Sequence, residues 1–368
     1  MAWEDPGVTK NMRLSNGTTT WAAGGTPLNI PIQQTGILRE MRLITSGTVT
    51  EALGGGTATQ DVLAPGNLYT QVVLSPNQQS PILQCRGHAL AMIQYLLSVE
   101  RNSAQPFSDL ATILQGSPDS AYFLQPTGGG VLNTNFLLPV AQKIRTLGGH
   151  VGFWPLQNPA VQLQLAITPN TASTATPYNI YSTTAGAAPY LTTGAATEVI
   201  ATPSVDVVRD LWSVPDNEKD TPLFNVASTW VEETPQTFTT TRFQWNAPSL
   251  IGLIVRLGCF VFNSTTGAGI AAGSMTASNA IGIYTDNDAP KFVETATEAL
   301  TRQKDFYGSP LPLGCFAYDL LGTDLTLQDV LDTNNVANIK LIGNFSSAVG
   351  AASYAYVLRQ VISPLVIR

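Results

Sequence analysis

Pro248-Ser-Leu-Ile-Gly-Leu-Ile-Val-Arg-Leu-Gly-Cys-Phe-Val-Phe262 is the most apolar stretch of the chain. A helix needs about 20 apolar residues to span a membrane, and this run is shorter and carries Arg256 in its middle. The run therefore predicts a β-strand in a core. Alternation assigns its side chains to two faces, Val255, Leu257, Cys259 and Val261 on one and Ile254, Arg256, Gly258, Phe260 and Phe262 on the other. Both faces are mostly apolar, so we expect both to be covered.

A second stretch near the amino terminus has a similar build. Residues 36–50 contain a Gly, then Leu and Ile residues, then the pair Arg42-Leu43, and they end in Thr-rich sequence. The first stretch carries Arg256-Leu257 at the equivalent place. Each stretch belongs to a segment that reads strand, strand, loop, helix, strand, strand. These parallels predict one architectural unit used twice.

Charged residues are scarce in this chain. They make up 12% of the 368 residues, against about 25% in a typical globular protein, whereas hydrophobic residues make up 44%. We expect a surface rich in Thr, Ser, Asn and Gln, with much of it in contact with other chains. The formal net charge of -7 argues against nucleic-acid binding, which needs clustered Lys and Arg. The length predicts two domains or more.

The cysteines and the amino terminus give the expected compartment. Cys85, Cys259 and Cys315 are widely spaced and form no CxxC pair, so we expect buried free thiols made in a reducing cytoplasm. The first residues lack a basic region followed by an apolar run, so no secretory signal is predicted. Residues 1–25 are polar and are interpreted as an arm rather than a packed element.

Periodicity and turn residues predict the remaining elements. Strands are expected at 28–32, 37–49, 68–74, 161–167, 250–262, 314–319, 339–345 and 352–362, with extended sequence at 226–245. Helical spacing predicts a helix at about 88–99 and a second one from Pro290 to just before Gly308. Pro27 and Pro31 push the first strand to a sheet edge. The fold class is mainly β, with an arm at 1–25, a first domain at 26–195 and a second at 196–368.

The order of these elements resembles a known family of virion proteins. The paired strand units at 37–49 and 253–262, the helix within each unit and the segment Pro312-Leu-Gly-Cys-Phe-Ala-Tyr-Asp319 carry the resemblance. The family is that of the major capsid proteins of tailless icosahedral viruses with an internal membrane, the tectivirus-like group. The resemblance covers nearly the whole chain. It implies two eight-stranded antiparallel jelly-roll sandwiches in tandem, interrupted by short helices.

The same resemblance implies an assembly. Three subunits would form a pseudo-hexagonal capsomer that contacts neighbouring capsomers and penton or minor capsid proteins. Loops at 54–65, 168–197 and 263–279 would form towers or interfaces, and residues 1–16 would be an inward arm near the membrane. The implied location is the virion shell, after synthesis in the host cytoplasm.

Motifs for catalysis or cofactor binding are weak. The two histidines are His88 and His150, and Cys85-Arg-Gly-His88 could pair a thiol with an imidazole, although a packed or solvated histidine is favoured. The glycines of residues 267–273 follow a strand, but the third glycine of a dinucleotide loop comes one residue late and no βαβ unit surrounds it. We predict no catalytic, cofactor-binding or metal-binding residue, and no enzymatic activity.

Carboxylate pairs and glycosylation patterns have simple structural readings. Glu232-Glu233 and the pair Asp286 and Asp288 are interpreted as solvated turns, since the latter lacks the glycine and distal Glu of a calcium loop. The Asn-X-Ser/Thr pattern is attributed to chance where it occurs, at Asn16, Asn263 and Asn344.

The leading hypothesis is a structural virion protein that assembles as trimeric capsomers into an icosahedral shell. One alternative is another virion β-sandwich, such as a spike, tail or sheath component. The other is a carbohydrate-binding or carbohydrate-active β-sandwich. That alternative requires exposed aromatic side chains beside carboxylates, and its candidates are Trp212, Trp230 and Trp245.

Overall fold

The computed structural model describes most of the chain between residues 10 and 364. The described residues are 10–20, 26–52, 59–60, 68–77, 80–101, 121–125, 129–145, 149–156, 162–169, 181–182, 197–216, 226–248, 252–263, 274–308, 311, 314–322, 325–327, 329–333, 335–336, 338–346 and 353–364. Most of the predicted tower loops at 54–65, 168–197 and 263–279, and residues 1–9 of the predicted arm, lie outside these ranges.

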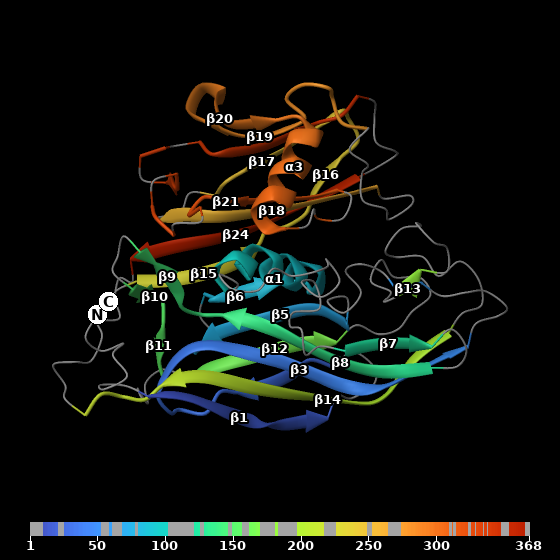
Figure 1. Cartoon of the computed structure of the whole chain (residues 1–368), viewed down its shortest axis with the longest axis vertical. Helices are drawn as coiled ribbons and strands as arrows, with labels where there is room; N and C mark the ends of the chain where they lie inside the picture. The colour runs from blue at the N-terminus through green and yellow to red at the C-terminus, as the bar shows by residue number, and fades with distance from the viewer. Residues whose placement is uncertain are drawn as a thin grey trace.

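Strands dominate the structure, as the mainly β prediction states (Figure 1). The first part of the chain contains β1 (Asn11–Thr20), β2 (Leu28–Pro31), β3 (Ile37–Ala52), β4 (Thr59–Gln60), β5 (Tyr69–Pro76), β6 (Leu83–Cys85), α1 (Gly87–Arg101), β7 (Ala121–Gln125), β8 (Gly129–Pro139), β9 (Gln142–Ile144), β10 (Gly149–Val151), β11 (Trp154–Pro155), β12 (Leu163–Pro169), β13 (Tyr181–Ser182) and β14 (Thr197–Trp212). The second part contains β15 (Val226–Glu232), β16 (Gln236–Phe238), β17 (Arg242–Asn246), β18 (Leu253–Asn263), β19 (Ile281–Thr285), the 3-10 turn η6 (Asp286–Asp288), β20 (Ala289–Glu294), α3 (Ala296–Tyr307), β21 (Cys315–Asp319), β22 (Leu331–Asp332), β23 (Lys340–Asn344) and β24 (Ser353–Pro364).

Three large sheets are formed by the described strands. A six-stranded sheet has the order β1-β14-β3-β8-β7, with β11 also paired to β3. A ten-stranded sheet has the order β2-β12-β5-β6-β15-β24-β18-β21, with β16 on β24 and β22 on β18. A four-stranded sheet has the order β17-β23-β19-β20. The predicted edge position of the first strand is confirmed, because β2 ends the ten-stranded sheet.

The predicted repeat is confirmed by strand order. In the first unit β3 lies between β14 and β8, and in the second β18 lies between β24 and β21. The series β2-β12-β5-β6 matches β17-β23-β19-β20 in the same way. Helix α1 follows β6, and α3 follows β20. The two units are therefore two copies of one topology, drawn one below the other in Figure 1.

Each unit encloses an apolar core between its two sheets. The first core contains residues such as Leu43, Leu74 and Phe136, and the second contains residues such as Leu257, Ile283 and Leu341. At about 25 cal/mol per Å² of apolar surface removed from water, these cores are the main source of stability. The first core also extends onto Phe260 and Leu358 of the second unit, so the two units share packed side chains.

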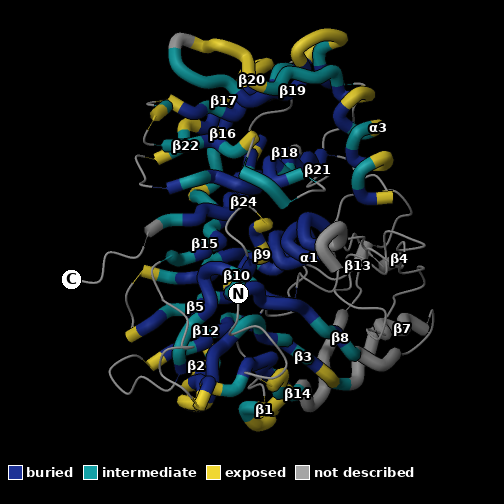
Figure 2. Tube along the Cα trace, turned by 60° about the vertical axis from the view of Figure 1, so that its left-hand side comes forward, coloured by how far each residue is buried: buried dark blue, intermediate teal, exposed yellow. Residues whose placement is uncertain are grey.

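Helix α1 confirms the helix predicted at 88–99. Its sequence is apolar around most of its circumference, which is the pattern of a helix surrounded by protein. Residues Ala89 to Leu97 are buried, as the dark tube in Figure 2 shows. The Gln94 side chain donates to the carbonyl of Leu137 at 2.8 Å and accepts from its N–H at 3.1 Å. Gln94 thus satisfies backbone groups of β8 that would otherwise be buried without partners. Among the described residues, no helix has the length and apolar character needed to cross a membrane.

The second predicted helix begins later than expected. Pro290 lies in strand β20, and α3 starts after Thr295, whose hydroxyl accepts from the Glu298 N–H while Glu298 accepts from the Thr295 N–H. This reciprocal capping box fixes the helix start. Gly308 ends the helix with φ 80°, as predicted.

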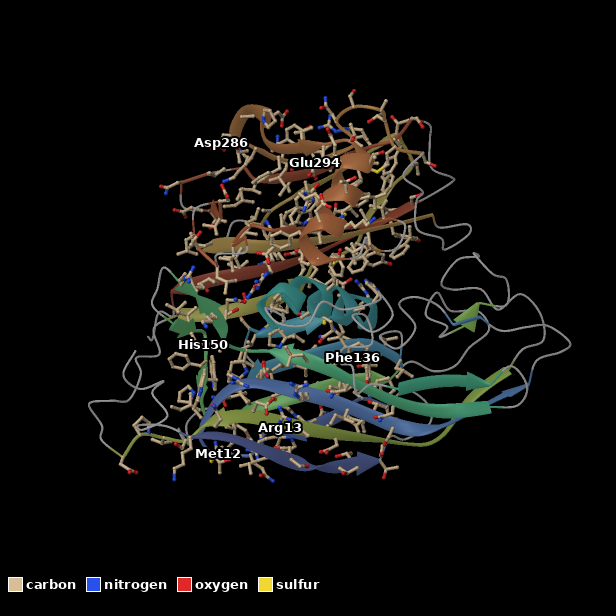
Figure 3. All side chains as sticks on the ribbon, viewed as in Figure 1. Met12, Arg13, Phe136, His150, Asp286 and Glu294 are labelled. Atoms are coloured by element: carbon tan, nitrogen blue, oxygen red, sulfur yellow. The ribbon has the colours of Figure 1, made fainter. Side chains whose placement is uncertain are left out.

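The predicted unpaired arm is wrong for residues 11–20. They form β1, antiparallel to β14, with Met12 opposite Leu211 and Arg13 opposite Asp210 (Met12 and Arg13 are labelled in Figure 3). Arg13 Nε lies 2.6 Å from Asp210 Oδ1, and the Ser15 hydroxyl lies 2.7 Å from Asp206. Because β1 is an edge strand with one solvated face, its sequence carries little of the apolar alternation that marks a strand.

The face assignment of the opening stretch is correct from Arg256 onward and wrong before it. A β-bulge lies between Ile254, opposite Val361, and Arg256, opposite Gln360. The extra residue in β18 is Val255. A bulge of this kind reverses the facing of the residues that precede it. Ile254 therefore packs in the second core with Leu257, and Val255 packs in a separate cluster.

Candidate functional site

The framework of the junction between the two units is a shared sheet. Strands β6 and β15 pair in parallel, with Leu83 beside Trp230 and Gln84 beside Val231. The Trp230 N–H donates to the Ile82 carbonyl at 2.7 Å. This pairing joins four strands of the first unit to the strands of the second in one continuous sheet. The strand pairing thereby ties the two units directly to each other.

A buried arginine crosses the same junction. Arg256 on β18 is fully buried, and its Nε lies 2.9 Å from Asp319 Oδ2 on β21. Its Nη1 donates to Gln142 of β9 at 2.6 Å and to Gln360 of β24 at 2.8 Å. Gln360 also donates to the Ser228 hydroxyl at 3.0 Å. A buried charge requires such pairing, and because Gln142 belongs to the first unit, the network fixes how the units meet.

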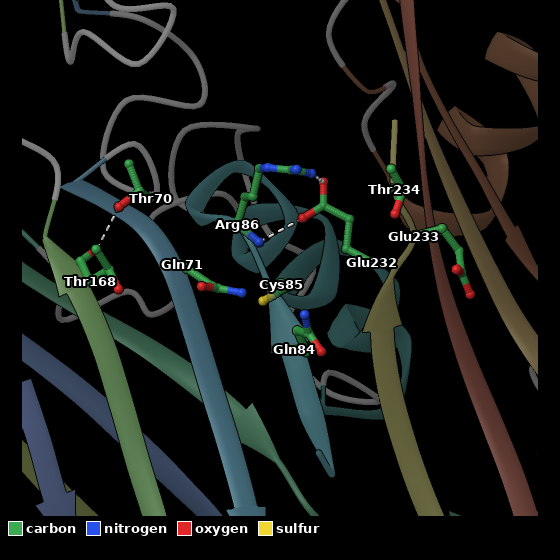
Figure 4. Close-up of a pocket in the computed structure, with 9 residues that line it drawn as sticks. All are labelled: Thr70, Gln71, Gln84, Cys85, Arg86, Thr168, Glu232, Glu233 and Thr234. Carbon is green, nitrogen blue, oxygen red and sulfur yellow. Dashed lines mark hydrogen bonds and ion pairs between the residues drawn. The ribbon is translucent and has the colours of Figure 1, made fainter. Parts of the chain in front are cut away.

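A second buried charge lies at the start of α1 (Figure 4). Glu232, the last residue of β15, accepts from the Arg86 N–H at 2.6 Å and from His88 Nε2 at 2.7 Å. The Arg86 guanidinium lies 3.3 Å away. A carboxylate at a helix amino terminus is stabilised by the helix dipole. A side chain of the second unit thus caps the helix of the first.

The pKa of Glu232 reflects these contacts. Burial raises the pKa of this carboxyl, but the charge and hydrogen bond of His88 and the contacts of Arg86 outweigh burial, so the pKa lies below its ordinary value. The carboxylate is therefore ionised at neutral pH. The His88 ring packs edge-on against Phe260, with the centroids 4.7 Å apart, which holds the imidazole in place.

Helix α1 fills the remaining space of the junction. A Cβ added to Gly258 on β18 would lie 2.7 Å from Met92 Cγ, so glycine allows the helix to approach the strand. The rings of Tyr95 on α1 and Tyr307 on α3 have centroids 4.3 Å apart. The helix of the first unit therefore packs on the outer face of the second unit's sheet and against its helix.

A polar cavity of about 280 Å³ opens beside Glu232, where β6 ends and β5 and β15 diverge. Thr70, Gln71, Thr168 and Thr234 contribute to its lining. Within the described part of the chain, no group of three or more His, Cys, Asp or Glu side chains could hold a metal ion. Two pairs of its lining residues are bound to each other, Thr70 to Thr168 and Arg86 to Glu232.

The weak catalytic motifs have structural roles. Burial raises the pKa of the Cys85 thiol well above its ordinary value, which disfavours the reactive thiolate. The predicted buried thiols are confirmed, since Cys85, Cys259 and Cys315 are all buried and none of them is in a disulfide. His88 binds Glu232, and the imidazole of His150 lies edge-on to Trp212 at 5.1 Å.

The interpretation as a solvated turn is wrong for Glu232, which is buried at the end of β15, and the other candidate residues have partners where the structure describes them. Glu233 pairs with Arg359, Asp288 accepts from Lys340 at 2.7 Å, and Asp286 accepts from the Asn338 N–H at 2.9 Å. The amide of Asn16 binds the Pro31 carbonyl and that of Asn344 binds the Asn279 carbonyl. Residues 267–273 lie outside the described part.

The three tryptophans do not form a sugar-binding surface. Trp212, Trp230 and Trp245 are 5%, 0% and 2% exposed, and each belongs to a different apolar cluster. The carbohydrate alternative required exposed aromatic side chains, and these three tryptophans are buried.

Comparison with known proteins places this architecture. No family model matches the sequence, and no curated protein sequence matches it. Solved structures match over almost the whole chain. The STIV MCP, a major capsid protein, superposes with a TM-score of 0.64 at 16% identity, covering 96% of this chain and 97% of that one. The chain has the double jelly-roll fold.

Other capsid structures give the same result. The PBCV-1 virus capsid superposes with a TM-score of 0.59 at 11% identity, covering 96% of this chain and 94% of that chain. The major capsid protein of Bacteriophage PM2 superposes with a TM-score of 0.54 at 8% identity, covering 98% and 99%. Within the double jelly-roll fold, β3 and β18 are equivalent strands of the two jelly rolls, and α1 and α3 are equivalent helices.

Two features of the sequence indicate buried charges at the junction, although neither residue was predicted as a site residue. Glu232 follows Trp230 by two residues, so both lie on one face of β15, and a carboxylate on the same face as a buried tryptophan indicates a buried pair. Arg256, which lies within the apolar run of β18, also indicates a buried charge. Their partners could not be found by spacing, because Gln142 and Gln360 are 114 and 104 residues away from Arg256.

Proposed function

We propose that the chain is a major capsid subunit, which assembles as trimeric pseudo-hexagonal capsomers into an icosahedral shell. The observation that carries this proposal is the whole-chain match to capsid proteins, with coverage of 94% or more of both partners in the structures from STIV, PBCV-1 and Bacteriophage PM2. A fold alone does not determine function, so two physical arguments are added.

Geometry gives the first argument. Two similar jelly rolls in one rigid chain give a trimer six similar lobes, and six lobes tile a nearly hexagonal lattice. The buried Arg256 network and the shared sheet fix the angle between the two lobes, which a closed shell requires.

Surface chemistry gives the second argument. Charged residues make up 12% of the chain, so subunit faces can come together with few charges to strip of water. The partners in this proposal are copies of the chain, neighbouring capsomers and penton or minor capsid proteins, with residues 1–16 toward an internal membrane. The location is the virion shell, after synthesis in a reducing host cytoplasm, and the role is structural rather than catalytic.

The division of the chain follows from the repeat. Strand β14 pairs with β1 and β3 of the first unit, although it follows residue 195 in sequence. We place the division of the two jelly rolls between β14 and β15, so that each unit contains one complete copy of the topology. Limited proteolysis with cleavage confined to residues 213–225 would support this division, and preferred cleavage near residue 195 would contradict it.

The mass of the purified protein in solution tests the proposed function. Light scattering after size exclusion should give a species of three times 39.1 kDa, and negative-stain images should show hexagonal outlines or shells. A monomer that stays soluble at high concentration would contradict the proposal. No observation on the described residues favours the spike, tail or carbohydrate alternatives.

A further inference from the structure

The junction within the chain has a counterpart whose two halves lie apart. Inside the chain, β6 of the first unit pairs in parallel with β15 of the second. Strand β20 is equivalent to β6, because each ends the series of its own sheet and precedes the helix of its unit. Strand β1 is equivalent to β15, because each pairs antiparallel with the last long strand of its unit. The repeat therefore defines a second pair of strands, β20 and β1.

Both strands have a free edge. Among the described strands, β20 pairs with β19 alone and β1 with β14 alone. Figure 1 places β20 and β1 at opposite ends of the long axis, so the two edges cannot meet within one chain. Free strand edges are sites for pairing with another chain. The strand numbers also match, since the four-stranded sheet that ends in β20 and the six-stranded sheet that ends in β1 would together equal the ten-stranded sheet of the junction.

We propose that β20 of one copy of this chain pairs in parallel with β1 of a second copy, reproducing between subunits the junction that β6 and β15 make within one. This inference rests on the proposed assembly of the chain with itself and names the surfaces involved. The contact is head-to-tail, and such a contact closes into a ring when the rotation between copies divides a full turn. Three copies, each contributing two lobes, close such a ring.

We expect α3 to pack at the contact between subunits as α1 packs at the junction within the chain. Helix α1 packs on the outer face of β18, where Arg256 is fully buried and Gly258 meets Met92. By equivalence, α3 packs on the outer face of β3 in the second copy. There Arg42 holds the position of Arg256 and is 22% exposed, whereas Arg256 is fully buried.

The two faces that would meet both carry charged side chains. The outer face around β3 carries three arginine side chains with exposures of 61%, 32% and 22%: Arg13, Arg39 and Arg42. The exposed side of α3 carries Glu298 and Asp305 beside Lys304. The charges of α3 balance, because Arg302 and Lys304 offset Glu298 and Asp305, and the three arginines of the sheet pair within the chain with Glu40 and Asp210, so charge does not select this docking. Leu14 on β1, which is 40% exposed, gives the same edge an apolar contact to bury.

Cysteine cross-linking tests the proposal. Leu14 and Lys291 are exposed on β1 and β20, and the native cysteines are buried. Leu14→Cys/Lys291→Cys protein, treated with a bismaleimide of short spacer, should give covalent dimers and trimers on a denaturing gel. Each single variant should stay at the monomer position, because a head-to-tail contact brings position 14 beside position 291 and not beside another copy of itself.

A matched control uses the opposite edge of the same sheet. Gln244 is exposed on β17, so Leu14→Cys/Gln244→Cys carries two accessible thiols in the wrong places. At least a tenfold excess of cross-linked product over this control is expected. A trimer by light scattering without that excess would overturn the β20–β1 contact and leave the capsid proposal standing. A protein that is monomeric before cross-linking would overturn both.

Discussion

Strands β3 and β18 hold the same place in two copies of one fold, yet their outer faces differ. On β18 the arginine is fully buried and lies among Asp319, Gln142 and Gln360. On β3 the equivalent Arg42 stays partly exposed and contacts Asp210 at 3.2 Å. The difference arises because α1 packs on β18, whereas the equivalent arginine of β3 keeps 22% of its side chain exposed. One fold used twice therefore gives one fully buried arginine and one partly exposed arginine.

The largest contrast is expected from removing the two arginines. Arg256→Ala leaves Asp319 buried without its cation, which costs about 3–5 kcal/mol for a broken buried pair. Arg42→Ala breaks a partly exposed contact and should cost about 1 kcal/mol or less. Urea unfolding of both variants measures the two costs. Equal losses would show that the faces are not energetically distinct.

Glu232→Gln tests the charge that caps α1. Loss of charge-assisted hydrogen bonds from Arg86 and His88 should cost about 2–3 kcal/mol at pH 7. Because the folded-state pKa of Glu232 lies below its ordinary value, its contribution is present above the unfolded pKa of about 4.3 and is lost as the pH falls through the folded pKa. The wild type and the variant should therefore converge as the pH falls through the folded-state pKa of Glu232.

The pH series has its own control. Glu298→Gln changes an exposed carboxyl whose pKa is lowered by the Thr295 N–H and hydroxyl, in a capping box outside the junction. It should leave α1 and the inter-unit contacts unchanged, which hydrogen exchange of the α1 peptide reports. A gap between the wild type and Glu232→Gln that widens in acid would contradict the assignment.

Gly258→Ala tests the close approach of α1 to β18, and it should lower the free energy of unfolding by less than Arg256→Ala and Glu232→Gln do. Its new Cβ would lie 2.7 Å from Met92 Cγ, and the strain of displacing this side chain should cost about 1 kcal/mol or slightly more. Adding Met92→Ala removes the clash, so the double variant should lose less than the sum of the two single changes. Additive losses in urea unfolding would place the strain elsewhere.

Much of this architecture could be predicted from the sequence. The repeat was visible because Arg42-Leu43 and Arg256-Leu257 lie in similar strands, and alternation at 161–167 corresponds to the buried pattern of β12. Strand β1 was not predicted from the sequence, because an edge strand with one solvated face needs few apolar residues. The bulge at Val255 was not predicted from the sequence, because alternation alone does not reveal an inserted residue.

The junction could be predicted only in part. Arg256 in an apolar run and Glu232 beside a buried tryptophan both signal buried charge, but their partners come from other strands. Periodicity describes local structure, whereas Gln142 reaches Arg256 through the packing of one jelly roll on the other. Such a contact depends on three-dimensional arrangement, so no spacing rule along the chain could supply it.

We infer that the junction makes the two jelly rolls one cooperative body. Pulsed hydrogen exchange with mass spectrometry along a urea series tests it, because peptides from β3 report on the first unit and peptides from β19 on the second. We expect one shared midpoint in the wild type and separated midpoints in Arg256→Ala. Two well-separated midpoints in the wild type would contradict it, since the units would then unfold as independent domains.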